Sequence, residues 1–135
     1  MKRVKIVAGN WKMNTDLERA YALTKEVEGM MRDEVNTDAE VILCPPFVSL
    51  AGVAKILEGN SRIAVGAQNC HQEEKGAYTG SISAEMVAST KATHVIIGHS
   101  ERRQYFNETD TLLAEKMNTV LSNDLEAIFC FLMKF

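Results

Sequence analysis

Five short runs of apolar, mostly β-branched residues recur along the chain, and their spacing limits the folds it can adopt. The runs begin about 20 to 40 residues apart, which leaves room for a helix between successive strands, as parallel strands require. They do not alternate apolar with polar residues, so we expect strands buried on both faces of a parallel sheet. The predicted strands cover residues 4–8, 41–44, 63–67, 94–97 and 127–132. The pattern predicts an α/β fold of alternating βα units.

The segments between the runs carry helix signals. Residues 15–18, Thr-Asp-Leu-Glu, match a capping box and predict a helix that starts at Thr15. The apolar face of this helix is predicted to contain Leu17, Tyr21, Thr24, Val27 and Met31. Two prolines, Pro45 and Pro46, end the second strand.

Two further helices follow the second and fourth strands. The first is predicted to bury Leu50, Val53 and Leu57. Either Asn107 or Thr109 can cap the last helix. Its apolar stripe is predicted to contain Leu113, Met117, Val120 and Leu121. No linker or low-complexity segment divides the chain, so residues 1–135 are expected to form one domain.

Composition and charge exclude several classes of protein. The chain is 46% hydrophobic and 24% charged, as in an ordinary globular protein, and its net charge of −3 offers no basic footprint for nucleic acid. No apolar run has the length of a membrane-spanning helix, and we expect a cytoplasmic protein. Cys44, Cys70 and Cys130 lack the paired spacing of a metal site or a disulfide framework. We expect reduced thiols and no metal or other cofactor.

Chemically capable side chains follow the first and fourth predicted strands directly. Residues 8–14 read Ala-Gly-Asn-Trp-Lys-Met-Asn and residues 98–103 read Gly-His-Ser-Glu-Arg-Arg. Ligands bind at the carboxyl ends of the strands in parallel α/β proteins. Asn10, Lys12, His99 and Glu101 therefore form the candidate site, with an amide, a cation, an imidazole and a carboxylate.

Each of these residues also has a purely structural interpretation. Lys12 alone would be a solvated surface charge, and Asn10 could bond its own backbone at the start of a loop. Glu101 suits the first turn of a helix that begins near Ser100, where a negative charge is favourable. The other two histidines, His71 and His94, have no expected chemical role.

Both strings closely resemble the triosephosphate isomerase family. The resemblance implies an eight-stranded (β/α) barrel, of which this chain would supply about the first five strands, and interconversion of dihydroxyacetone phosphate and glyceraldehyde 3-phosphate. It implies that Lys12 neutralises the substrate phosphate and the enediolate, that Asn10 binds substrate, and that neutral His99 is the electrophile. Glu101 would orient Lys12, and Cys130 would lie near the site for structural reasons.

The resemblance also implies an interface between subunits. The irregular stretch from Gln68 to Ile82 could be a mobile surface loop, but in the family the matching loop inserts into a partner subunit. Tyr78 and Thr79 would lie at its tip, and Arg102 would pair with a partner glutamate that Ser81 replaces here. We expect self-association through this loop and through exposed edge strands.

The resemblance extends from residue 4 to residue 130, after which the tail Phe131–Phe135 departs from the family pattern. The family's glutamate base, its lid and its phosphate-binding glycine loops have no counterpart in the 135 residues. We therefore expect negligible isomerase activity from this polypeptide alone, because losing an essential base costs orders of magnitude in rate. The alternative function is that of an inactive fragment that only folds and self-associates.

Overall fold

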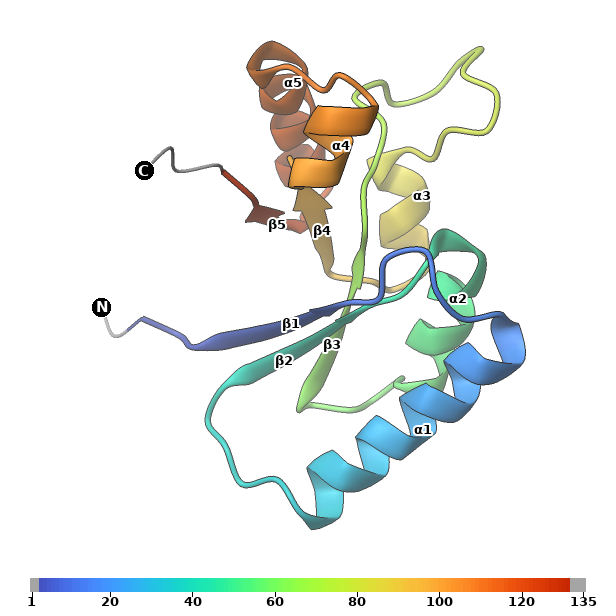
Figure 1. Cartoon of the computed structure of the whole chain (residues 1–135), viewed down its shortest axis with the longest axis vertical. Coiled ribbons are helices and arrows are strands. Elements are labelled where there is room, and N and C mark those ends of the chain that lie inside the picture. Colours follow the sequence, from blue (N-terminus) through green and yellow to red (C-terminus); the bar gives the residue numbers. More distant parts are fainter. Residues whose placement is uncertain (1–2, 132–135) are drawn as a thin grey trace.

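The computed structural model describes residues 3–131, which form a five-stranded parallel sheet in the order β1-β2-β3-β4-β5 (Figure 1). The strands are β1 (Ile6–Asn10), β2 (Glu40–Cys44), β3 (Ile63–Ala67), β4 (His94–Ile97) and β5 (Glu126–Phe129). The helices are α1 (Leu17–Asp33), α2 (Phe47–Ile56), α3 (Ala84–Ser89), α4 (Ser100–Tyr105) and α5 (Asp110–Ser122). This architecture confirms the predicted α/β fold of alternating βα units.

The strand order is sequential, so each strand lies beside the next one in the chain. Sequential parallel strands joined by right-handed crossovers place their helices on one side, and the sheet curls into part of a barrel. The long ladder between β1 and β2 runs from Ile6 opposite Glu40 to Asn10 opposite Cys44, whereas β3 and β4 pair only through Gly66 and Ala67. Within residues 3–131, β1 and β5 are the two edges of the sheet.

Each face of the sheet has its own apolar cluster. The outer face packs against the helices in the larger cluster, which includes Leu43, Val65 and Ile97 from the strands with Leu50 and Val53 from α2. The inner, concave face carries a smaller cluster. Its members are Ile42, Cys44 and Ile96, with Ala64, Ile128 and Cys130 packed against them. The expected burial on both faces is confirmed for β2, β3 and β4, whereas the edge strands β1 and β5 are exposed or only partly buried, because each lacks a neighbour on one side within residues 3–131.

The first helix was predicted to start at Thr15, but its N-cap lies one residue later, at Asp16. Asp16 is the N-cap, and its side chain accepts a hydrogen bond of 2.9 Å from the Arg19 amide. Thr15 has φ +73°, a left-handed conformation that cannot begin a right-handed helix. Thr109, one of the two predicted caps, is the N-cap of α5. Its side chain accepts a hydrogen bond from the Leu112 amide.

Two predicted strands are displaced along the chain. The first was expected at residues 4–8 but spans Ile6–Asn10, because pairing with β2 continues as far as Asn10 opposite Cys44. The fifth begins one residue early, at Glu126, and ends at Phe129. The predicted strand end at Leu132 lies outside the described residues.

Two predicted core positions are exposed. Leu17 lies in the first turn of α1 and Leu121 near the end of α5, and both face solvent, whereas Thr24, Met31, Leu113 and Val120 are buried as expected. Leu50, Val53 and Leu57 are also buried. The sequence analysis did not predict α3, a helix of six residues capped by Ser83. No helix within residues 3–131 has the length and apolarity that crossing a membrane would need.

Candidate active site

The loops after β1 and β4 meet at the carboxyl end of the sheet. Lys12 Nζ lies 2.7 Å from Glu101 Oε1, and Glu101 Oε2 lies 3.5 Å from His99 Nδ1. The Lys12 and Glu101 side chains remain 52% and 44% exposed. The structure therefore brings three of the predicted site residues together where a small anionic ligand can reach the ammonium group.

The backbone of the first loop holds Lys12 in an unusual conformation. Lys12 has φ +54°, in the left-handed region that a side chain with a Cβ rarely adopts. Its amide donates to Asn10 Oδ1 at 3.0 Å, and the Trp11 amide donates to the Cys44 carbonyl at 3.1 Å. Asn10 therefore forms the hydrogen bond to nearby backbone that its purely structural interpretation predicts. The same bond fixes the backbone of Lys12. Such strained residues persist where the surrounding structure over-determines them, often at functional sites.

Two supporting amides were missed by the sequence analysis. Gln68 Nε2 donates to the carbonyls of Lys12 and Cys44, both at 2.9 Å, and so joins the first loop to the end of β2. Asn14 Nδ2 donates to the Trp11 carbonyl at 2.8 Å. Gln68 follows β3 directly, so the rule that strand ends carry functional side chains could have found it.

His99 is held in one orientation by the helix that it caps. Its Nδ1 accepts a hydrogen bond of 3.2 Å from the Glu101 amide at the start of α4. A ring nitrogen that accepts from an amide carries no proton, so the neutral imidazole bears its proton on Nε2. This geometry leaves Nε2 as the hydrogen-bond donor of the His99 ring.

Glu101 is an anion in this arrangement. The hydrogen bond from Lys12 holds the pKa of the Glu101 carboxyl below its usual value, against the smaller opposing effect of desolvation. A general base that works near neutral pH needs a raised pKa. Glu101 is instead suited to orienting the Lys12 ammonium group.

The expected interface residues lie apart from these groups. Tyr78 stacks on His71, with ring centroids 4.4 Å apart, and no hydrogen bond or ion pair within residues 3–131 joins Tyr78 or Thr79 to the cluster around Lys12. Arg102 Nε binds Glu108 Oε1 at 2.6 Å in the same chain. The Arg102 guanidinium is thus bound within its own chain. Ser81, which stands where the resemblance expects a glutamate, has no carboxylate to offer it.

Arg102 belongs to a buried network that the sequence analysis did not find. Glu108 Oε1 also accepts from Lys116 Nζ at 2.5 Å, and Lys116 Nζ lies 2.8 Å from Asn69 Oδ1. Burial alone raises the pKa of the Glu108 carboxyl, but the hydrogen bonds from Lys116 and Arg102 outweigh it and hold the pKa below its usual value. The Glu108 network thereby fixes α5 against the start of the long loop.

Residues 3–131 place neither a cluster of metal-ligating side chains nor a thiol of lowered pKa beside the site. Within residues 3–131, no three His, Cys, Asp or Glu side chains are arranged to hold a metal. Burial raises the pKa of the Cys44 thiol to about 12 and that of Cys70 to about 11. Cys130 lies at the end of the fifth strand and is partly buried, and burial raises the pKa of its thiol too.

Comparison with known proteins decides the family. The triosephosphate isomerase family matches residues 5–132. The chain belongs to this family. It is 50% identical over 128 residues to a triosephosphate isomerase of Cytophaga hutchinsonii and 52% identical over 129 residues to one of Phocaeicola vulgatus. In both cases the alignment covers 95% of this chain and 50% of the relative.

A solved structure supports the same assignment. The triosephosphate isomerase of Bartonella henselae superimposes with a TM-score of 0.82 at 38% identity, covering 94% of this chain and 50% of that one. The five-stranded curled sheet is thus part of the family's barrel. The chain spans about half the length of the curated relatives that it matches.

Proposed function

We propose that this chain supplies the electrophilic half of a triosephosphate isomerase active site. The observation that carries the proposal is the convergence of Lys12 and Glu101, at 2.7 Å, beside a His99 ring whose Nε2 is free to donate. Isomerising a hydroxyketone phosphate requires an electrophile for the enediolate oxygen and a cation for the phosphate. His99 and Lys12 have these two properties.

Each residue takes a defined step. Lys12 binds the substrate phosphate and offsets the negative charge that develops on the enediolate, while Glu101 fixes the direction of its ammonium group. The His99 Nε2–H donates to the oxygen that gains charge when a carbon-bound proton leaves. Asn10 contacts the substrate near the reacting carbons and keeps Lys12 in its strained conformation. The substrates would be dihydroxyacetone phosphate and glyceraldehyde 3-phosphate, with no cofactor.

The proton-abstracting base must come from outside the 135 residues. Glu101 is committed to Lys12, and the family's glutamate, lid and phosphate loops have no counterpart here. We therefore infer that the polypeptide needs a second segment that matches the other half of the relatives. By itself it would behave as a folded fragment without isomerase activity.

The test measures turnover of glyceraldehyde 3-phosphate with and without the C-terminal half of the Cytophaga hutchinsonii relative as a separate polypeptide. A Lys12→Ala chain, prepared identically, exposes contaminating host enzyme. We expect equal, negligible rates without the added half and a Lys12-dependent gain with it. Lys12-dependent turnover by the chain alone would show that a base is recruited within it and would overturn the half-site proposal.

We also propose a cytoplasmic protein that self-associates. The loop from Gln68 to Ile82, with Tyr78 and Thr79 near its tip, would insert into a partner, and Arg102 would lie at the rim of that contact. The edge strands β1 and β5 expose Ile6, Val7 and Phe129, with backbone groups open to a further strand. Sedimentation velocity of the chain beside a Tyr78→Ala, Thr79→Ala variant tests the loop. If the variant associates as strongly as the parent chain, the loop is not part of the contact.

A further inference from the structure

Arg103 is a mostly buried arginine of α4 that lies four residues after His99, and its side chain is 18% exposed. Its guanidinium forms bonds in three directions. Nε donates to the Gly98 carbonyl at 2.9 Å, Nη2 donates to the Cys130 carbonyl at 3.3 Å, and Nη1 lies 2.6 Å from Asp110 Oδ1. A planar guanidinium with five N–H donors can make all of these bonds at once, whereas a lysine ammonium is a single point charge.

The three acceptors belong to three different segments of the fold. Gly98 joins β4 to α4, Cys130 follows β5, and Asp110 is the first residue of α5. The Cys130 amide donates to the Ile97 carbonyl at 2.8 Å, so the pairing of β4 with β5 continues as far as this point. Arg103 closes over the same place from α4. One side chain therefore fixes the ends of β4 and β5 and the start of α5 relative to one another.

The packing around Gly98 leaves no room for a side chain. Gly98 has φ +76°, a conformation that favours glycine. A Cβ at this position would lie 2.9 Å from the Cys130 carbonyl oxygen and 3.1 Å from Arg103 Nη2. The end of β5 and the guanidinium are thus in direct contact with the backbone that leads into His99. This backbone has little freedom to move while Arg103 is in place.

Arg103 binds the peptide groups on both sides of His99. The Gly98 carbonyl and the His99 amide belong to one planar peptide unit, so the bond from Arg103 Nε to that carbonyl fixes the plane. On the other side, the main-chain amide of Arg103 donates to the His99 carbonyl at 3.1 Å. The ring is then held by the Glu101 amide, which donates to Nδ1. That last bond forms only if the two peptide groups present His99 correctly.

We propose that Arg103 is a positioning residue for His99. It acts through the Gly98 peptide, and it ties the direction of the His99 ring to the end of the edge strand β5. The value of this positioning for catalysis rests on the proposed function, in which His99 Nε2–H donates to the substrate. A misplacement of about 1 Å at a reacting group can cost about a hundredfold in rate, so the residue that sets the direction of the ring matters.

The experiment uses the 135-residue chain alone and follows the two ring nitrogens of His99 by ¹⁵N NMR. At about pH 8.5 an ordinary imidazole is neutral, so the two shifts report which nitrogen carries the proton. In the parent we expect well-separated shifts with the proton on Nε2. In Arg103→Gln we expect the two shifts to move toward each other, because a ring released from the Glu101 amide exchanges between tautomers. His71 and His94 in the same spectra are internal references and should not change.

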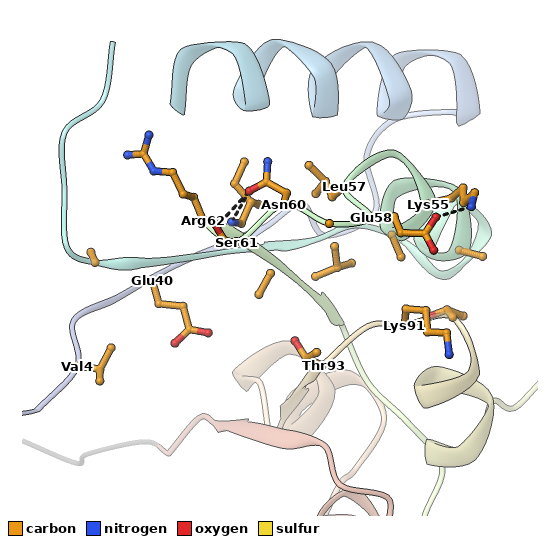
Figure 2. Close-up of a pocket in the computed structure, with 18 of the residues that line it drawn as sticks. Val4, Glu40, Lys55, Leu57, Glu58, Asn60, Ser61, Arg62, Lys91 and Thr93 are labelled. Atoms are coloured by element: carbon orange, nitrogen blue, oxygen red, sulfur yellow. Dashed lines mark hydrogen bonds and ion pairs between the residues drawn. The ribbon is translucent and has the colours of Figure 1, made fainter. Parts of the chain in front are cut away.

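Arg62→Gln is the matched control. The Arg62 guanidinium also binds two backbone carbonyls, those of Met31 and Val35. Arg62 precedes β3 and lines a cavity at the amino ends of the strands, the opposite end of the sheet from His99 (Figure 2). This variant loses the same kind of bonds and should leave the His99 shifts at their parent values. Arg103→Lys keeps one donor for the three acceptors, and its shifts should lie between those of the parent and Arg103→Gln.

Two results would overturn the proposal. Arg103→Gln could lower the free energy of unfolding in urea and leave the His99 shifts unchanged, which would make Arg103 structural only. Arg62→Gln could move the His99 shifts as far, which would make the change a general loosening. If Arg103→Gln does not fold, Asp110→Asn, which releases only Nη1, replaces it and should move the shifts in the same direction by less; unchanged shifts there would equally overturn the proposal.

The proposed function can fail without affecting this result. Its failure appears as an absence of Lys12-dependent turnover when the C-terminal half of the relative is added. The His99 shifts are measured in the chain alone and require no turnover. Movement of the His99 shifts in Arg103→Gln therefore supports the positioning role whether or not the completed protein is an isomerase.

Discussion

Two lysine–glutamate pairs of nearly equal length lie in very different surroundings. Lys12 and Glu101 are 2.7 Å apart with side chains 52% and 44% exposed, whereas Lys116 and Glu108 are 2.5 Å apart with side chains 5% and 2% exposed. The buried pair is supported by Arg102 and Asn69. Within residues 3–131, His99 is the one further charged or ionisable side chain that the ion pairs place beside the exposed pair.

The difference separates a structural role from a chemical one. Two buried charges are costly to desolvate and are held by each other and by their polar neighbours, so removing one partner is severe. An exposed pair adds little stability because water and salt screen it. Its ammonium group stays available, which a ligand-binding lysine requires. The same two residue types thus hold α5 in place in one region and leave an accessible ammonium group in the other.

The largest effect is expected from breaking the buried pair. Glu108→Ala leaves Lys116 buried without its carboxylate and should destabilise the chain by about 3–5 kcal/mol. Urea unfolding measures the loss. The double change Glu108→Leu, Lys116→Met removes both charges and should recover most of it. A double variant as unstable as the single one would show that packing, and not charge, dominates this region.

Acid should weaken the buried pair next. The folded-state pKa of Glu108 is lowered from 4.5, so its contribution is complete above about pH 4.5 and is lost as the pH falls through the folded value. Unfolding free energies between pH 7 and pH 3 should fall less steeply in Glu108→Gln than in the parent. Glu115→Gln, on the exposed side of α5, is the control. Equal slopes in parent and Glu108→Gln would contradict the lowered pKa.

The two pairs also differ in how far the sequence predicts them. Lys12 and Glu101 lie just after apolar strands, in the two sequence segments that resemble the family. Both observations are visible in the sequence, and each identifies the pair. Glu108 and Lys116 look like ordinary charges of a loop and a helix, because their burial depends on how Asn69 and Arg102 pack around them. The cap of α1 was misplaced for a similar reason: the backbone of Thr15 is left-handed, and the capping pattern carries no information on φ. Local spacing predicts elements, whereas burial of charge needs the tertiary fold.

Backbone strain gives a smaller test of the exposed pair. Because Lys12 has φ +54°, Lys12→Gly should be more stable than Lys12→Ala by about 1–2 kcal/mol, although both lose the ammonium group. Thermal unfolding compares the two. The neighbouring Met13 is exposed and has no positive φ, so Met13→Gly should be no more stable than Met13→Ala. If alanine is preferred at both positions, the loop is not strained at Lys12.

The smallest effect on stability is expected from Lys12→Met, which keeps the length of the side chain and removes the charge. The free energy of unfolding should change little, since the pair is exposed and screened by water and salt. The pKa of Glu101 should rise toward its ordinary value, because the hydrogen bond from Lys12 is what lowers it. Carboxylate NMR titration of Glu101 measures this directly. A Glu101 pKa that stays low, or a stability loss as large as that of Glu108→Ala, would mean that the exposed pair is structural after all. The distinction between the two regions would then fail.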